Sequence, residues 1–158
     1  MVKLLIEHGR GGLYVVETPK ERRKFRELMN LFHPQGYVVA PMMRGKRDLV
    51  YKIGDDWCVL IQLHKINNFN LSRMYRLDWE ETWFIRRILT VPTAKEKHGD
   101  VAVEALQALE AWLRKGGNEA IITLTLPRHS GGLYKKAGYV ELAKTRKGDK
   151  VWFIRRLR

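Results

Sequence analysis

Tyr134, Gly138 and Tyr139 form the most chemically informative group in the last third of the chain. Three residues separate Tyr134 from Gly138, and Tyr139 follows directly. A phenol can donate a proton as a general acid, and glycine suits the left-handed residue that ends a helix. The spacing predicts a short helix that ends at Gly138. Tyr134 is then either a chemical group or an aromatic side chain packed on the core.

A second candidate is the turn formed by Lys97, His98 and Gly99, which opens a predicted helix over Val101–Arg114. A loop that enters a helix N-terminus supplies backbone N–H donors and a positive field, and both suit a phosphate group. Asp100 follows the turn and is a good helix N-cap. The turn therefore predicts either an anion-binding loop or an ordinary capped helix start.

The elements that position these groups begin with a strand over Trp83–Val91, which stops at Pro92. Arg86 and Arg87 point to opposite faces of this strand, so at least one of them faces something polar. After the helix, a second strand follows over Ala120–Leu126. A strand, a helix and a strand in this order predict a parallel pair joined by a right-handed crossover.

The rest of the chain is predicted to be mostly strands. Thr18, Pro19 and Glu21 indicate the capped start of one further helix, which runs to Phe32. We expect an α/β or α+β fold, a mixed and mostly antiparallel central sheet with flanking helices, in one domain over residues 1–158. The remaining predicted strands are Met1–Glu7, Leu13–Glu17, Tyr37–Pro41, Asp48–Ile53, Trp57–His64, Val140–Lys144 and Val151–Leu157, and Leu71–Leu77 is either a strand or a loop.

The composition is strongly basic. The chain carries 30 Lys and Arg against 17 Asp and Glu, a formal net charge of +13. Such a field favours polyanions: nucleic acid, acidic proteins or a phosphorylated cofactor. The alternative is that the positive charge serves only to keep the protein soluble.

The cysteine and histidine content and the length of the apolar runs bear on three features: the redox compartment, metal binding and membrane insertion. Cys58 lies in an apolar run, is expected to be buried, and as the single cysteine favours a reducing compartment. One cysteine and five histidines without ligand spacing predict no metal site. No apolar run approaches the ~20 residues that span a bilayer. We therefore expect a soluble, cytoplasmic protein with no membrane partner.

The stretch Trp83–Tyr139 resembles the cofactor-binding half of the GCN5-related N-acetyltransferases, the GNAT superfamily. In that family a strand and a helix N-terminus hold acetyl-CoA, through a loop with the pattern Arg/Gln, any, any, Gly, any, Gly/Ala. Alignment on the helix puts Asp100 where the family has its middle glycine, and a carboxylate there would repel the pyrophosphate. The resemblance implies cofactor contacts from Lys97, His98, Gly99, Val101 and Ala102.

The same resemblance assigns roles outside this loop. The last residues of the strand, here Leu89 and Val91, would lend backbone groups to the pantetheine amides. Tyr134 would lie beside the cofactor sulfur and protonate the departing thiolate. Pro127 replaces an Asn that the family often has, and residues 128–130 (Arg, His, Ser) either bind the 3′-phosphate or form a solvated loop.

The family often takes the proton of its amine substrate with a Glu on or before this strand. Asp78, Glu80 and Glu81 precede the strand here, and Glu81 lies closest to it. Glu81 is therefore the predicted base, and His64 is the alternative.

The resemblance implies acetyl transfer from acetyl-CoA to an amine acceptor. The competing hypothesis is a GNAT-fold protein with a decayed cofactor site, whose basic surface binds nucleic acid or an acidic protein. A basic relative that acts on DNA, like the phage Mom DNA-modification proteins, lies between the two. The acceptor and the oligomeric state stay open at this point.

Overall fold

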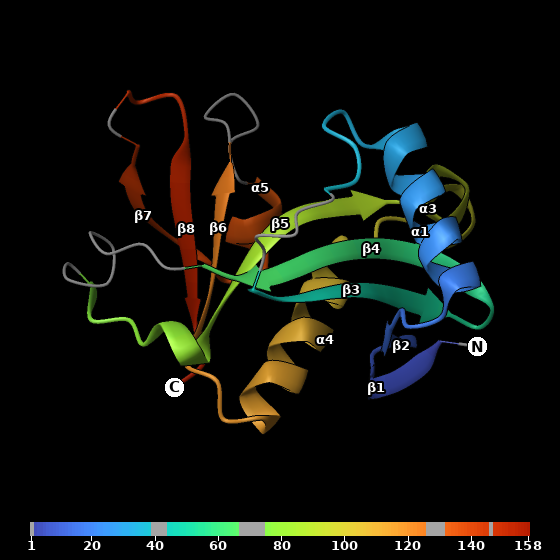
Figure 1. Cartoon of the computed structure of the whole chain (residues 1–158), viewed down its shortest axis with the longest axis horizontal. Coiled ribbons are helices and arrows are strands. Elements are labelled where there is room, and N and C mark those ends of the chain that lie inside the picture. The colour runs from blue at the N-terminus through green and yellow to red at the C-terminus, as the bar shows by residue number, and fades with distance from the viewer. Residues whose placement is uncertain (1, 39–43, 67–74, 126–131, 146) are drawn as a thin grey trace.

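The backbone forms one eight-stranded mixed sheet with helices on both faces (Figure 1). The computed structural model describes residues 2–38, 44–66, 75–125, 132–145 and 147–158. The strands are β1 (Lys3–His8), β2 (Gly11–Val15), β3 (Arg44–Ile53), β4 (Asp56–Lys65), β5 (Thr82–Thr90), β6 (Ala120–Thr125), β7 (Val140–Lys144) and β8 (Val151–Arg156). The helices are α1 (Pro19–Phe32), α3 (Pro92–His98), α4 (Ala102–Lys115) and α5 (Gly132–Lys136), with a short 3-10 helix η1 (Trp79–Glu81).

The strand order is β1-β2-β3-β4-β5-β6-β8-β7. Among the described strands, β5 and β6 form the parallel pair and the other neighbours are antiparallel. A parallel pair needs a long crossover connection, and α3 and α4 lie within it. The predicted fold class, with its mixed and mostly antiparallel sheet, is confirmed, and so is the parallel crossover.

Helix α1 begins as its sequence predicts. The Thr18 hydroxyl accepts the Glu21 N–H at 3.2 Å, and the Glu21 carboxylate accepts the Thr18 N–H at 3.0 Å. This reciprocal pair is a capping box. Phe25 is fully buried under the helix and packs edge-on against Tyr37, whose hydroxyl donates to Asp48 of β3 at 2.9 Å. Helix α1 therefore covers the face of the sheet toward which Asp48 points, here called the α1 face.

Helix α4 covers the opposite face, here called the α4 face. Asp48 and Tyr51 are three residues apart along β3, so their side chains point to opposite faces. The Tyr51 hydroxyl lies 3.2 Å from Glu104 Oε2 in the first turn of α4. The buried side of α4 is formed by Ala102, Ala105, Leu106, Ala108, Leu109 and Leu113.

Strand β5 has one extra residue within the segment that pairs with β4. Gln62 of β4 pairs with Arg87, and the next residue, Leu63, pairs with Ile85, so Arg86 is the extra residue of a β-bulge. A bulge bends its strand. The register between β5 and β6 ends at Ile85, directly before the bulge. Beyond that point β5 follows β4 and leaves β6, and Figure 1 shows the two strands diverging.

Helix α3 is the main difference from the predicted elements. We expected Lys97, His98 and Gly99 to form a turn before the next helix, but Pro92 begins a separate helix that includes Lys97 and ends at His98. Proline is favoured at the first helical position, and the prediction was wrong because it treated Pro92 only as the end of a strand.

One smaller prediction also differs, because Tyr37 and Val38 are not in a strand. Residues 75–77 are not in a strand either, which agrees with the loop alternative for Leu71–Leu77. The other residues of these two segments lie outside the described part of the chain, as do Pro127 and residues 128–130. Within the described ranges, none of the helices has the length and apolar character needed to cross a membrane.

Candidate active site

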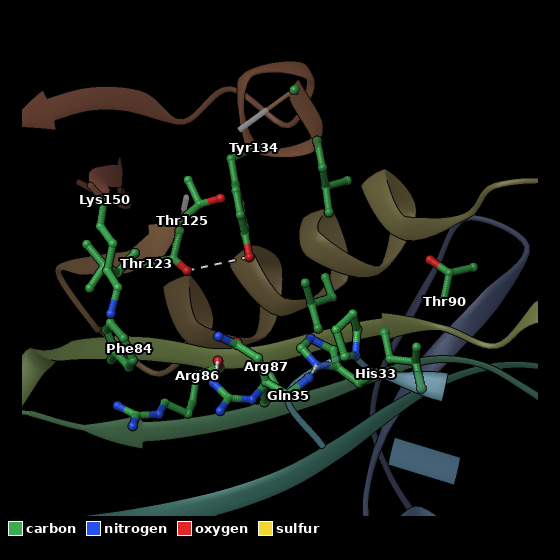
Figure 2. A pocket seen from close by; sticks show the side chains of 16 residues that line it. His33, Gln35, Phe84, Arg86, Arg87, Thr90, Thr123, Thr125, Tyr134 and Lys150 are labelled. Carbon is green, nitrogen blue, oxygen red and sulfur yellow. Dashed lines mark hydrogen bonds between the residues drawn. The ribbon is translucent and has the colours of Figure 1, made fainter. Parts of the chain in front are cut away.

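A cleft of about 610 Å³ lies where β5 and β6 separate (Figure 2). This volume is in the range of small-molecule sites. The cleft is bounded by β5, β6, α5 and the segment after α1. Its lining comes from residues 33–35, 84, 86–90, 123–125, 132–134 and 150.

Tyr134 extends from α5 toward β5 in this cleft (Figure 2). Its hydroxyl lies 3.5 Å from the Thr123 hydroxyl of β6, which in turn lies 3.1 Å from the Ile85 carbonyl oxygen. The Tyr134 side chain is only 8% exposed. Burial raises the pKa of Tyr134, so the phenol keeps its proton at neutral pH. Its role as the proton donor stays a prediction.

Gly138 ends the helix that carries Tyr134, as its spacing predicts. It has φ 91°, and the following N–H, that of Tyr139, donates to the Tyr134 carbonyl at 2.9 Å. A Cβ at Gly138 would lie 2.8 Å from the Arg155 guanidinium. Only glycine combines this backbone conformation with this space, so Gly138 fixes the direction in which the chain leaves α5.

The backbone of β5 presents alternate residues to the cleft. The Val91 N–H donates to the Cys58 carbonyl of β4 at 2.8 Å, so the Val91 amide faces β4. Backbone groups alternate in direction along a strand, so Leu89 faces β4 in the same way. Ile88 and Thr90 then direct their backbone groups toward the cleft that both of them line. This differs from the expectation that Leu89 and Val91 offer those groups.

The start of α4 is closed by a carboxylate from the chain itself. Asp100 Oδ1 accepts the Ala102 N–H at 3.1 Å. Val101 is 1% exposed and packs in the core, while its carbonyl accepts the Ala105 N–H. Neither Val101 nor Ala102 lines the cleft, and their predicted cofactor contacts stay predictions.

Lys97 and His98 make an ion-pair cluster with the β3–β4 hairpin. The Lys97 ammonium and His98 Nε2 each lie 2.8 Å from Asp56 Oδ2. Hydrogen bonds from Lys97 and His98 lower the pKa of Asp56, although desolvation opposes them. Gly99 has φ 80°, and its N–H donates to the Lys95 carbonyl at the end of α3. The three residues predicted to bind phosphate are thus held by internal partners.

A further pair that the sequence did not indicate lies beside this helix start. Arg10 Nη2 bonds Glu104 Oε1 at 2.7 Å, and Arg10 also donates to the His98 carbonyl at 3.0 Å. The hydrogen bond from Arg10 is the main reason that the pKa of Glu104 is lowered. Arg10 precedes Glu104 by 94 residues, so no local pattern could have paired them.

The two predicted bases lie away from Tyr134. Glu81 is in η1, at the end of β5 far from the bulge, and pairs with Arg158. His64 is 3% exposed and packs beside Phe84, with ring centroids 5.2 Å apart. Burial lowers the pKa of His64, so its ring is neutral at pH 7. The structure therefore brings neither group into the lining of the cleft.

Among the described residues that line the cleft, the charged groups are cationic. They are Arg86 and Arg87 from β5, Lys150 before β8, and the titratable His33 after α1. Figure 2 shows both arginines across the cleft from Tyr134. Burial and Arg87 lower the pKa of His33, so at neutral pH the fixed positive charge comes from the other three.

Metal and thiol chemistry have little support in the described residues. No group of three or more His, Cys, Asp or Glu side chains is placed there to hold a metal ion. Cys58 is fully buried, and burial raises the pKa of its thiol. Reactive thiols have a lowered pKa, so the expectation of a buried structural Cys58 is confirmed.

Comparison with known proteins gives similarity in sequence to a viral protein and similarity in structure to many solved proteins. Uncharacterized protein 154 of Sulfolobus islandicus rod-shaped virus 1 is 32% identical over 141 residues, which cover 84% of this chain and 88% of that protein. No protein-family model matches the sequence.

The structural likeness is to acetyltransferases. The GNAT domain of S. lividans PAT superimposes with a TM-score of 0.64 at 12% identity, covering 94% of this chain and 91% of that one. A Bacillus subtilis acetyltransferase, solved in complex with CoA, gives 0.63 at 19% identity, covering 94% and 99%. At these identities the likeness establishes the GNAT fold.

Proposed function

Because this chain belongs to the family of the rod-shaped-virus protein 154 and has the GNAT fold, we propose that it is an N-acetyltransferase that uses acetyl-CoA. The observation that carries the proposal is the cleft at the separation of β5 and β6, with a protonated Tyr134 in its wall. The Bacillus subtilis relative of this fold was solved with CoA bound, which supports the same donor here.

The residues of the cleft fit the thioester end of acetyl-CoA, which supplies an activated acetyl group. Ile88 and Thr90 direct backbone groups into the cleft, where they would hold the pantetheine amides. The acceptor nitrogen bonds to the acetyl carbon as the carbon–sulfur bond breaks. Tyr134 gives its proton to the sulfur, and a base takes the proton that the nitrogen loses.

The phosphate end fits less well. Asp100 holds the Ala102 N–H that a pyrophosphate at the start of α4 would need, and Asp56 holds Lys97 and His98. We propose that the phosphates bind only when Asp100 releases this amide, at a cost in affinity. The thioester end then contributes most of the binding free energy.

Neither Glu81 nor His64 lines the cleft, so the base acts from outside the lining or is His33. His33 lines the cleft, but its Nδ1 accepts the Gln35 N–H at 3.1 Å, so in the neutral ring Nε2 carries the proton. That nitrogen is suited to donate rather than to accept. Glu81 stays the proposed base and would act through water, since it does not line the cleft.

Calorimetry with two donors tests the proposal. Acetyl-CoA and S-acetylpantetheine share the thioester and the pantetheine, and only acetyl-CoA has the pyrophosphate. We expect both to bind with similar affinity and to release thiol in the presence of an amine. If neither acetyl-CoA nor S-acetylpantetheine binds at about 1 mM, the proposed enzymatic function is excluded.

A second candidate function is nucleic-acid binding. Helix α1 exposes a row of cations on the same face of the sheet as Arg87: Lys20, Arg22, Arg23, Lys24 and Arg26. Cations on one face attract a phosphate backbone, and such binding weakens steeply as salt rises. A fluorescence titration with an oligonucleotide at several salt concentrations tests it, and an affinity that does not depend on salt would exclude it.

A further inference from the structure

Arg87 is held in one orientation by backbone carbonyls. Its Nε donates to the Gly36 carbonyl at 3.2 Å, and its Nη1 donates to the Arg86 carbonyl at 2.9 Å. In the register of the sheet Arg87 stands beside Gln62, which stands beside Asp48, so its side chain is on the α1 face. A fixed guanidinium loses little entropy when it binds a further acceptor.

The charge of Arg87 is not neutralised within the cleft. None of the described residues that line the cleft is Asp or Glu. Burial and the neighbouring Arg86 both lower the pKa of Arg87, which means that its surroundings disfavour the cation. Asp48 is the nearest carboxylate in the sheet register, and it is occupied by the Tyr37 hydroxyl at 2.9 Å and by Gln62 at 3.4 Å. A half-buried cation that has no counter-ion within the described part of the chain is suited to an anionic ligand.

The position of Arg87 separates it from the donor side of the proposed reaction. Tyr134 and the start of α4 lie on the α4 face, whereas Arg87 and the segment after α1 lie on the α1 face. If Tyr134 meets the donor sulfur from one side, the acceptor amine approaches from the other. An anion bound to Arg87 therefore belongs to the acceptor.

We infer that the acceptor amine carries a compact acidic group, a carboxylate or a phosphate, which Arg87 binds through its free N–H groups at the mouth of the cleft. The inference rests on the proposed acetyl transfer. Arg87 is then the residue that determines acceptor specificity, and Arg86 adds positive charge next to it.

Pairs of ligands that differ only in charge test the inference without turnover. N-acetylglycine and N-acetylglycinamide mimic the acetylated product with and without a carboxylate, and N-acetylethanolamine phosphate and N-acetylethanolamine do so for phosphate. In each pair we expect the wild-type protein to bind the acid about tenfold to a hundredfold more tightly, the range of one charge-assisted hydrogen-bond pair. The difference between the two acids shows which group the cleft prefers.

Variants assign the preference to Arg87. R87Q should lose it, so that acid and amide bind alike, while the affinity for S-acetylpantetheine stays within about twofold. R87K keeps the positive charge but lacks the paired N–H donors of the guanidinium, so it should retain part of the preference. If R87Q does not fold, R87K still tests whether the preference depends on residue 87. K115Q removes an exposed cation at the end of α4 and is the matched control, with an unchanged preference.

The outcomes separate this inference from the proposed function. Equal wild-type binding of acid and amide, or an unchanged preference in R87Q, would overturn the inference even if acetyl transfer is observed. If the preference for the acid depends on Arg87 but the protein binds neither donor, the anion site is supported and the acetyltransferase function is excluded. If a short oligonucleotide binds in a way that depends on Arg87 and neither compact acid binds, the site is assigned to a phosphodiester. That result would overturn the inference of a compact acidic acceptor.

Discussion

The rings of Tyr134 and Tyr139 lie with their centroids 5.3 Å apart, but of the two only Tyr134 lines the cleft. The Tyr139 hydroxyl is buried and has no hydrogen-bond partner among the described residues. The chain therefore supplies two neighbouring buried phenols, one that lines the cleft and one that does not. Removal of each hydroxyl in turn gives a matched pair of variants.

Y134F should lower kcat for acetyl transfer by about a hundredfold, because the leaving thiolate loses its proton donor. KM for the donor should change little, since the ring stays in place. Steady-state thiol release measures both constants. A Y134F enzyme with wild-type kcat would show that Tyr134 is only a core aromatic.

Y139F should leave kcat unchanged and should not destabilise the protein. Burial of an unpaired hydroxyl costs about 1 kcal/mol or more, so its removal is expected to raise the free energy of unfolding by a similar amount. Urea denaturation checks this. Lower stability in Y139F would mean that the hydroxyl has a partner in the folded protein.

D100N should tighten the binding of acetyl-CoA by about tenfold, because the negative charge leaves the proposed pyrophosphate site. Asn can still cap the Ala102 N–H in the free protein, so the helix should stay stable. As a neutral acceptor, Asn should release this amide to a pyrophosphate more readily than Asp100 does. Calorimetry with acetyl-CoA measures the effect, and S-acetylpantetheine should bind D100N and wild type alike.

The control for D100N is E141Q, which makes the same change in charge on the exposed side of β7. If E141Q tightens acetyl-CoA binding as much as D100N does, the effect comes from net charge and not from the start of α4.

E81Q distinguishes a base from a surface ion pair. As the base, Glu81 is expected to contribute about a hundredfold to kcat. As a partner of Arg158, it contributes at most about 1 kcal/mol to stability and nothing to rate. R158Q is the matched control, since it removes the ion pair and keeps the carboxylate. Equal rates in wild type, E81Q and R158Q would leave Glu81 without a catalytic role.

Glu21 gives a pH-dependent contribution to stability. Burial raises the pKa of Glu21, but hydrogen bonds from the Thr18 and Glu17 N–H groups help to hold it at about 2, below its ordinary 4.5. The ionised form is therefore favoured by folding, so the stabilisation is complete above pH 4.5 and is lost as the pH falls through about 2. E21A should cost about 1 to 3 kcal/mol at pH 7.

Denaturation of wild type and E21A from pH 7 to pH 2 measures this effect. The difference in unfolding free energy should shrink below pH 4.5, the ordinary pKa of Glu21. E27A, an exposed position on the same helix, should show no such dependence on pH. A constant difference for E21A across the range would contradict the role of the carboxylate.

Local signals in the sequence predicted most of the fold correctly. Thr18 and Glu21 identified the start of α1, Gly138 the end of α5, and the order of strands and helix the parallel β5–β6 pair. Each of these signals acts over a few residues or over one hydrophobic period, so the sequence contains it directly.

The site was harder to predict, because its residues depend on distant partners. Lys97 matched a phosphate-binding pattern, yet it bonds Asp56, which lies 41 residues away. Arg86 and Arg87 were expected on opposite faces of a regular strand. The bulge places both in the lining of the cleft, and it exists only in relation to the register of β4.

Arg86 is the extra residue of the bulge at which β5 leaves β6, and a strand without it would continue the regular sheet. The separation of β5 from β6 depends on the presence of this one additional residue and not on its side chain. Substitution of Arg86 should therefore leave the architecture intact, whereas its deletion would straighten the strand and shut the opening. In related chains, the length of this short stretch should be kept more strictly than its residue types.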